Sequence, residues 1–339
     1  MDNTLDCAGE AMTIGIAANL LAVAGIIAYV LWRAHPVTEA VRMRNALLLA
    51  SGRPEDFDWA PPQFPAGFKA ERLPATPEFR EIVAALKLDD LSGDWDKALA
   101  LATHLIKRVE YLGPVRADLL TTYRAIQNGY GYCADFVKIY LALAHTAGLT
   151  ARQWAFSFDG FGGHGHTVVE VYDRQRGKWL FLDVFNNFHV IDPESGEPIG
   201  VLECREALLA SLDAVCMRPN GPGRQGFVHR EKALEYYHRG VHQWYLLGGN
   251  AVFSYYAHPL VGAAGRVSKV LGQIAASIIG VTPGIRIYET PENVNQVRHL
   301  RSLRRQLVIL AILTLILLAT LAAQLILVGH GVGAPRGSG

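Results

Sequence analysis

Residues 129–144 read GYGYCADFVKIYLALA and decide the fold. Their apolar side chains recur at helical spacing, so we predict a helix that begins near Cys133 and ends at Gly148, where a glycine commonly closes a helix. The predicted apolar face of this helix consists of Phe136, Ile139, Tyr140, Leu143 and Ala144.

Helical patterns precede this helix and strand patterns follow it. The predicted helices cover about 77–87, 95–110 and 117–128. Three β-branched or aromatic-rich segments bounded by turn residues predict strands over 151–158, 165–173 and 178–185. A cysteine-bearing helix followed by antiparallel strands is an α+β arrangement. Beyond about residue 200 we expect helices again, including segments 230–247 and 259–281.

Cys133 lies at the start of its helix, after two glycines that allow close backbone approach, Gly129 and Gly131. A helix N-terminus carries partial positive charge, which favours the thiolate form of a cysteine. A free cysteine is more commonly a small buried hydrophobe. A nucleophilic role therefore requires a base within hydrogen-bond reach and a group that orients the base.

His166 opens the second predicted strand and Asp183 lies in the third. If the loop between residues 173 and 178 holds an even number of residues, such as Gln175-Arg176, position 166 faces 185 and position 168 faces 183. His166 and Asp183 then become diagonal neighbours on one face of the sheet. An odd loop without a bulge would put them on opposite faces.

Four blocks in this order resemble the transglutaminase-like superfamily of cysteine enzymes, over about 70 residues from Thr122 to Val190. The blocks are Gly131-Tyr-Cys133-Ala-Asp135, Gly148-Leu-Thr-Ala151-Arg152, His166-Thr-Val-Val-Glu170-Val-Tyr172 and Trp179-Leu-Phe-Leu182-Asp183. The resemblance implies a papain-like or transglutaminase-like core, in which the cysteine-bearing helix packs on an antiparallel sheet. It also implies that Cys133 is the nucleophile, His166 the base and acid, and Asp183 the residue that orients His166.

The sequence departs from the family near the histidine. Val168 stands where the family often has an aromatic residue, and residues 160–165 (GFGGHG) are rich in glycine. This segment is either a flap over the cysteine or a loop, and we favour the loop. His164 precedes the strand pattern, so His166 is the better base.

An acyl-transfer site also needs donors that stabilise the developing oxyanion. The backbone N–H of Cys133 is one donor, and the amide of Gln127, six residues earlier, is a second candidate. The alternative for Gln127 is a solvated polar residue near a helix end.

Two uncharged apolar runs, residues 13–32 and 307–328, are long enough to cross a bilayer core of roughly 30 Å. No basic residue precedes the first run and Arg33 follows it, whereas Arg298, Arg301, Arg304 and Arg305 precede the second. Basic residues favour the cytoplasmic side. We therefore expect a two-pass protein of the inner or plasma membrane, with its catalytic domain in the cytoplasm.

The expected organisation follows from these features. It comprises a short extracytoplasmic tail (1–12), a transmembrane helix (13–32), a connector (33–76), a transglutaminase-like catalytic domain (77–200), a helical extension with a basic juxtamembrane segment (201–306), a second transmembrane helix (307–328) and a short extracytoplasmic tail (329–339).

Cofactors and nucleic acid are not expected. The four cysteines have no paired spacing, and His238 and His242 lack a third ligand, so no metal site is predicted. The net charge of +1 argues against a general nucleic-acid binder. The expected partners are a peptide or protein substrate near the membrane, membrane lipids and other subunits of a membrane complex.

The sequence leaves the reaction open. A thiolate that attacks a carbonyl forms an acyl-enzyme, which water resolves in a protease or amidase and which an amine or hydroxyl resolves in an acyltransferase. We favour a membrane-anchored cysteine hydrolase, because water needs no second binding site. The alternatives are an acyltransferase with the same triad and an inactive scaffold subunit of a membrane complex.

Overall fold

The helix predicted at the cysteine is α6, Cys133–Thr146. Its predicted apolar face is buried: Phe136 is 1% exposed and Ile139, Tyr140, Leu143 and Ala144 are fully covered. Burial of each large apolar side chain contributes about 1.5–3 kcal/mol. The computed structural model describes residues 2–50, 52–106 and 112–332.

The helices around α6 and the strands after it follow the sequence patterns closely. The helices are α3 (Pro77–Ala85), α4 (Asp94–Leu105) and α5 (Leu119–Gln127), and the end of the predicted helix 95–110 falls on residues outside the described chain. The strands are β2 (Ala151–Ser157), β3 (Gly165–Asp173) and β4 (Lys178–Asp183).

Eight strands of the described chain form one mixed sheet in the order β1-β8-β7-β2-β3-β4-β5-β6, in which only the β1–β8 pair is parallel. The remaining strands are β1 (Leu49–Ala50), β5 (Phe188–Ile191), β6 (Cys216–Pro219), β7 (Trp244–Leu247) and β8 (Ile285–Ile287). The chain therefore has the expected α+β class.

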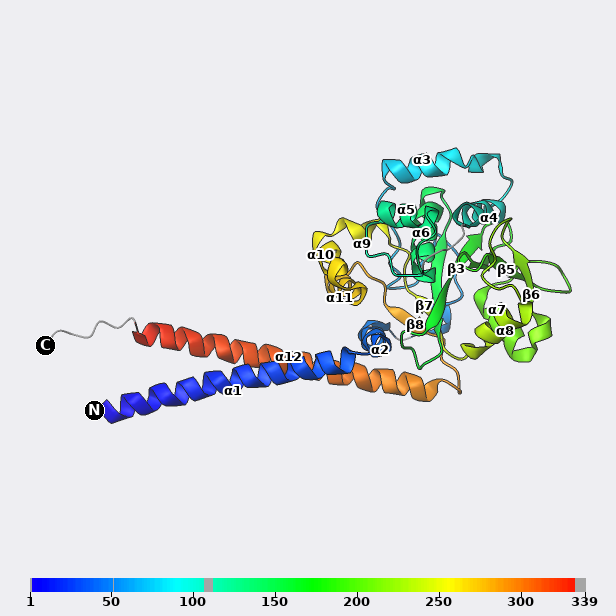
Figure 1. The fold of residues 1–339 in the computed structure, drawn as a ribbon. Helices are drawn as coiled ribbons and strands as arrows, with labels where there is room; N and C mark the ends of the chain where they lie inside the picture. The colour runs from blue at the N-terminus through cyan, green and yellow to red at the C-terminus, as the bar shows by residue number, and fades with distance from the viewer. Residues whose placement is uncertain (1, 51, 107–111, 333–339) are drawn as a thin grey trace.

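Helices cover both faces of this sheet (Figure 1). One core lies between the sheet and α3 to α6, and a second lies between the opposite face and α7 and α8. A third core joins β7 and β8 to α2 and to the start of α12. The other helices are α2 (Val37–Leu48), α7 (Val201–Ala210), α8 (Arg230–Arg239), α9 (Phe253–Ala257), α10 (Pro259–Val267) and α11 (Lys269–Ile279).

The expectation of continuous helix over 230–247 is wrong at its end, because residues 244–247 form β7. β7 pairs with β2 and β8, which lie far away in the sequence. Such non-local pairing overrides local preference in a strand this short. Segment 259–281 is helical as expected, with a break at Ser268 that divides it into α10 and α11.

Two long helices extend from the domain side by side (Figure 1): α1, Asp2–Ala34, and α12, Val294–Val332. Both are long and apolar enough to cross a membrane, over Met12–Ala34 and Val294–Gly329, and the most apolar window of each is unburied. Asn19 Nδ2 donates to Gln324 Oε1 at 2.9 Å across the pair. A hydrogen bond of this kind holds apolar helices together in lipid. Most of the predicted C-terminal tail, residues 333–339, lies outside the described chain.

Candidate active site

Cys133 is the first residue of α6 and follows Gly131, whose φ of 150° favours glycine. Asp135 fixes this turn, because its Oδ2 accepts hydrogen bonds from the backbone N–H groups of Tyr132 and Val115, both at 3.1 Å. The motif aspartate is thus a helix-capping residue. It keeps the helix N-terminus, with its partial positive charge, at the thiol.

The β3–β4 hairpin has the register that the sequence predicts. Asp173 pairs with Lys178 and Val169 with Leu182, so the loop holds an even number of residues and Val168 lies opposite Asp183. His166 and Asp183 share one face as diagonal neighbours. His166 Nε2 lies 2.6 Å from Asp183 Oδ2, which makes the expected hydrogen bond between the two side chains.

Asp183 is fully buried and its carboxylate accepts several further hydrogen bonds. Oδ1 accepts from the backbone N–H groups of Phe185 at 3.0 Å and Asn186 at 2.9 Å. Oδ2 accepts from the Asn186 amide at 2.9 Å and from the hydroxyl of Tyr237, a residue of α8. These donors and His166 outweigh burial, so the pKa of Asp183 lies below its usual value.

Tyr237 and Asn186 were not among the site residues that the sequence predicts. Asn186 lies three residues after Asp183 and could have been suspected from that spacing. Tyr237 is 54 residues away, and the only signal for it was the tyrosine-rich composition of 230–247.

His166 is 6% exposed and is enclosed by aromatic rings, including Phe156, Tyr236 and Tyr237. Burial alone would lower the pKa of His166. The charge of Asp183, the Cys133 sulfur and the hydrogen bonds to both residues outweigh burial and raise the pKa to about 10. Nε2 faces Asp183, so Nδ1 is the ring nitrogen left for the thiol. The arrangement can therefore hold a proton on His166 beside a sulfur nucleophile.

Cys133 and His166 line a cavity of about 820 Å³. Its walls come from one face of α2, from β2 and β7, and from the α9–α11 segment. A space of this volume is typical of small-molecule and peptide-segment sites. Asp183 and Tyr237 are not among the lining residues, so they act from behind His166.

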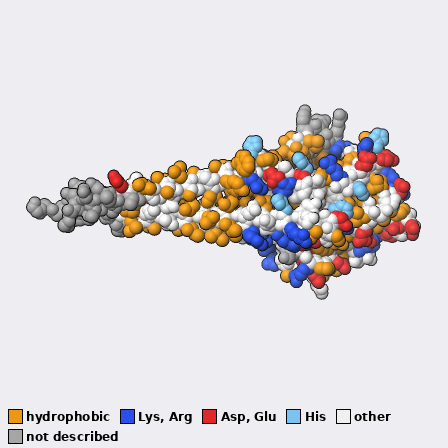
Figure 2. All heavy atoms as spheres, turned by 90° about the horizontal axis from the view of Figure 1, so that it is seen from below, with side chains coloured by type: hydrophobic (Ala, Val, Ile, Leu, Met, Phe, Trp, Pro, Cys, Tyr) orange, Lys and Arg blue, Asp and Glu red, His pale blue; other side chains and the backbone are white. Residues whose placement is uncertain are grey.

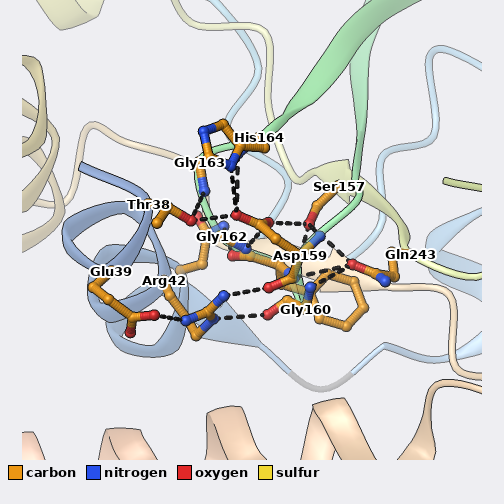
Figure 3. Close-up of polar contacts among 12 residues, drawn as sticks. Thr38, Glu39, Arg42, Ser157, Asp159, Gly160, Gly162, Gly163, His164 and Gln243 are labelled. Atoms are coloured by element: carbon orange, nitrogen blue, oxygen red, sulfur yellow. Dashed lines mark hydrogen bonds and ion pairs between the residues drawn. The ribbon is translucent and has the colours of Figure 1, made fainter. Parts of the chain in front are cut away.

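The glycine-rich segment before His166 is a loop held tightly by α2 (Figure 3). Asp159 is the centre of this network: Oδ1 accepts from Ser157 Oγ at 2.8 Å and from Gly162 N at 3.0 Å, and Oδ2 accepts from the Thr38 hydroxyl. Thr38 Oγ1 also accepts from Gly163 N at 3.1 Å.

A second tether to the loop comes from Arg42, whose Nε donates to Gly160 O at 3.1 Å. The glycines allow the close approach, because a Cβ on Gly163 would lie 3.0 Å from Thr38 Cα. The segment is therefore fixed between α2 and the strand that carries His166.

His164 lies on this loop with a 76% exposed side chain, and its Nδ1 faces Asp159 at 3.4 Å. Gln127 is the last residue of α5. Its amide nitrogen is buried and has no hydrogen-bond partner among the residues that the structure describes. Gln127 is not among the cavity-lining residues, and its oxyanion role stays a prediction.

The chain is similar to known proteins over part of its length. No curated protein matches the chain. A solved structure from Cytophaga hutchinsonii, proposed to be a cysteine protease, matches at 20% identity and a TM-score of 0.25. That match covers 32% of this chain and 36% of the other, so this chain spans about a third of the length of the solved structure. Residues 82–184 match the model of the transglutaminase-like superfamily, and this segment contains Cys133, His166 and Asp183.

Proposed function

We propose that the protein is a membrane-anchored cysteine hydrolase that cleaves a peptide or amide bond through Cys133, His166 and Asp183. The observation that carries the proposal is the hydrogen bond of 2.6 Å between His166 and Asp183. Cys133 lies close enough to raise the pKa of the same histidine, and both residues line the cavity. A base oriented by a buried carboxylate and placed at a thiol is the arrangement that nucleophilic catalysis requires.

The proposed reaction has two steps. The Cys133 thiolate attacks the carbonyl carbon, the C–N bond breaks, and the His166 imidazolium gives its proton to the leaving amine. A water molecule then gives a proton to His166 and attacks the thioester, which releases the acid and restores the thiolate and imidazolium pair. Asp183 holds the ring in place through both steps. The backbone N–H of Cys133 and the amide of Gln127 are the proposed oxyanion donors.

The same intermediate allows acyl transfer when an amine replaces water. The cavity of about 820 Å³ favours this second candidate, because it has room for an acceptor beside the acyl group. Product analysis separates the two: a free acid marks hydrolysis, and an amide formed with an added primary amine marks transfer.

We further propose that α1 and α12 cross the inner or plasma membrane and that the domain faces the cytoplasm. Figure 2 shows hydrophobic side chains along the pair of helices and basic side chains where the pair meets the domain. The basic residues at this junction of the chain are Arg33, Arg298, Arg301, Arg304 and Arg305. This arrangement follows the positive-inside rule.

The α10–α11 hairpin supports a domain close to the lipid. It lies on the side of the domain toward which α1 and α12 extend (Figure 1). It exposes apolar side chains there, including Ile278, which is 82% exposed, and Val267, which is 68% exposed. Exposed apolar helices of this kind lie in membrane interfaces.

The test is thiol labelling of the full chain in detergent at neutral pH. We expect iodoacetamide to modify Cys133 much faster than Cys216, which is also partly exposed, and Cys204 not at all, since burial raises the pKa of Cys204 to about 12. Labelling of Cys133 no faster than Cys216 would contradict a working nucleophile and favour the inactive scaffold. A reporter fused to the C-terminus tests the orientation: activity that appears only in the cytoplasm would contradict the proposed two-pass topology.

A further inference from the structure

We propose that the cavity beside Cys133 binds an anionic amphiphile, with its anionic group at Arg44 and its apolar part along the α10–α11 hairpin. The proposal rests on the proposed function, since it names the class of substrate that would reach Cys133.

Arg44 is held in the cavity wall by neutral groups. The face of α2 that lines the cavity consists of Val41, Arg44 and Leu48. Arg44 Nε donates to Asn45 Oδ1 at 2.9 Å, and Nη1 donates to Gln273 Oε1 at 2.6 Å. Two side-chain amides thus fix the direction of the guanidinium before any ligand arrives.

No carboxylate forms an ion pair with Arg44 among the residues that the structure describes. Burial acts to lower the pKa of Arg44 and the nearby Tyr245 and Tyr255 side chains act to raise it, yet a guanidinium stays protonated in proteins. A half-buried charge without an opposite charge nearby is unfavourable. A ligand that carries the missing negative charge would remove this cost.

The charge of Arg44 acts close to the nucleophile. Arg44 and Tyr245 are near enough to influence each other's pKa, and Cys133 also influences the pKa of Tyr245. All three residues line the same cavity. An anionic group on Arg44 would therefore lie in the same cavity as the carbonyl that Cys133 attacks.

The part of the cavity wall formed by α10 suits an apolar chain. Val261, Gly262 and Gly265 of α10 line the cavity, and a Cβ added at either glycine would meet no atom within 4 Å. The same hairpin exposes Leu260 and Ile278 on its surface. An acyl chain could thus lie along α10 with its end toward the lipid. The N–H groups of a guanidinium match the oxygen atoms of both carboxylate and phosphate groups. The anionic group could therefore belong to an acylated amino acid or to a phospholipid.

Two alkylating reagents of nearly equal shape test the anionic part. Iodoacetate carries a carboxylate where iodoacetamide carries a neutral amide. Each reagent is added separately to the full chain in phosphatidylcholine nanodiscs. The readout is the rate ratio of iodoacetate to iodoacetamide at Cys133. We expect Arg44→Gln to lower this ratio by about 10-fold, the lower end of the range for electrostatic attraction in a charged cleft. Arg116→Gln, which removes another charge that lines the cavity, is the matched control and should lower it much less.

Protection of Cys133 in the unmodified protein tests the amphiphile and does not depend on how Arg44→Gln folds. N-dodecanoylglycine should slow the iodoacetamide reaction, whereas its neutral amide should not, if the anion is a carboxylate. Phosphatidylglycerol added to the nanodiscs should slow it if the anion is a phospholipid phosphate.

The inference would be overturned if Arg44→Gln left the rate ratio unchanged, or if Arg116→Gln lowered the ratio equally. It would also be overturned if neither N-dodecanoylglycine nor phosphatidylglycerol slowed the alkylation of Cys133. These outcomes differ from failure of the proposed function, which appears as slow iodoacetamide labelling of Cys133 in every sample.

Discussion

Arg152 and Glu170 form a buried ion pair across β2 and β3, with 2.7 Å between Arg152 Nη2 and Glu170 Oε2 and only 2% of each side chain exposed. Glu170 also accepts from the Trp154 indole and from the backbone N–H of Val201, at the start of α7. The guanidinium of Arg152 lies 4.0 Å from the ring centre of Trp179. Two residues of the family-like blocks therefore hold the sheet and α7 together and take no part in the proposed chemistry.

Loss of this pair should destabilise the protein strongly. Glu170→Gln leaves the Arg152 charge buried without its partner, and breaking a buried pair in this way costs about 3–5 kcal/mol. We expect a clearly lower Tm for the variant in detergent. Glu197→Gln, which removes the partner of Arg176 at the surface, is the control and should change Tm little. Equal Tm values for the two variants would contradict the structural role of Glu170.

The carboxylate of Asp183 should set the alkaline limit of activity. The pKa of His166 is raised from 6.5 to about 10, so the proton on His166 stabilises the fold fully below the unfolded pKa, and this contribution is lost as the pH rises through about 10. If the imidazolium is needed for catalysis, kcat/KM should fall on the same alkaline limb. Asp183→Asn removes the strongest charge that raises this pKa.

We therefore expect Asp183→Asn to lower kcat by about 100-fold or more and to move the alkaline limb to lower pH by at least about one unit. The measurement is the pH profile of kcat/KM with a peptide or amide substrate found by screening. An unshifted limb with reduced kcat would mean that Asp183 only orients the ring and does not govern its protonation.

Tyr237 should act as a positioning residue for the same pair. Its hydroxyl donates to Asp183 and accepts from the Asn186 amide at 3.3 Å, and it does not line the cavity. Tyr237→Phe keeps the ring but removes one donor to the carboxylate, which makes Asp183 harder to hold as an anion. We expect kcat to fall by about 10-fold or more with KM unchanged, since a hydrogen bond to a charged group is worth about 1.5–3 kcal/mol.

The pH profile separates positioning from a general loss of stability. The limb assigned to His166 should shift in Tyr237→Phe in the same direction as in Asp183→Asn but by less. Tyr236→Phe is the control, because Tyr236 lies beside the same rings without a hydrogen bond to Asp183. A larger effect in Tyr236→Phe would exclude the proposed role of Tyr237.

Sequence patterns predict those parts of the fold that depend on near neighbours. The bounds of α6 and of β2 to β4 agree with their periodicity within about two residues, and the hairpin register followed from the parity of its loop. Each of these features is decided by side chains a few positions apart. The contact between His166 and Asp183 was predictable for the same reason.

The remaining parts depend on contacts between distant segments. The aromatic composition of Trp244–Leu247 fits a strand, yet only pairing with β2 and β8 makes it one. Thr38 contacts Asp159, which is 121 residues away in the sequence, and Tyr237 contacts Asp183, which is 54 residues away. No local pattern encodes such proximity, so the support behind His166 and Asp183 became visible only in three dimensions.

Gln127 provides a test of the oxyanion proposal. Its buried amide nitrogen has no partner among the described residues, although the side chain does not line the cavity. Gln127→Leu should lower kcat by about 100-fold if the amide stabilises the oxyanion, with little change in KM or in the rate of Cys133 alkylation. A normal kcat would instead identify Gln127 as a polar residue at the end of α5. Asn128→Leu at the neighbouring, exposed position is the control.

The contact between Thr38 and Asp159 should couple helix α2, which follows α1, to the strand that carries His166. Thr38→Val keeps the shape of the side chain but removes the donor to Asp159 and the acceptor for Gly163 N–H. We expect faster hydrogen exchange over residues 159–165 and a kcat lower by about 2- to 10-fold, because loss of one or two hydrogen bonds loosens the loop before His166 without removing a catalytic group. Thr146→Val is the control, since its hydroxyl bonds only to Ala142 O within α6. If hydrogen exchange of the loop is the same in both variants, α2 does not hold the loop, and the anchor and the active site are mechanically independent.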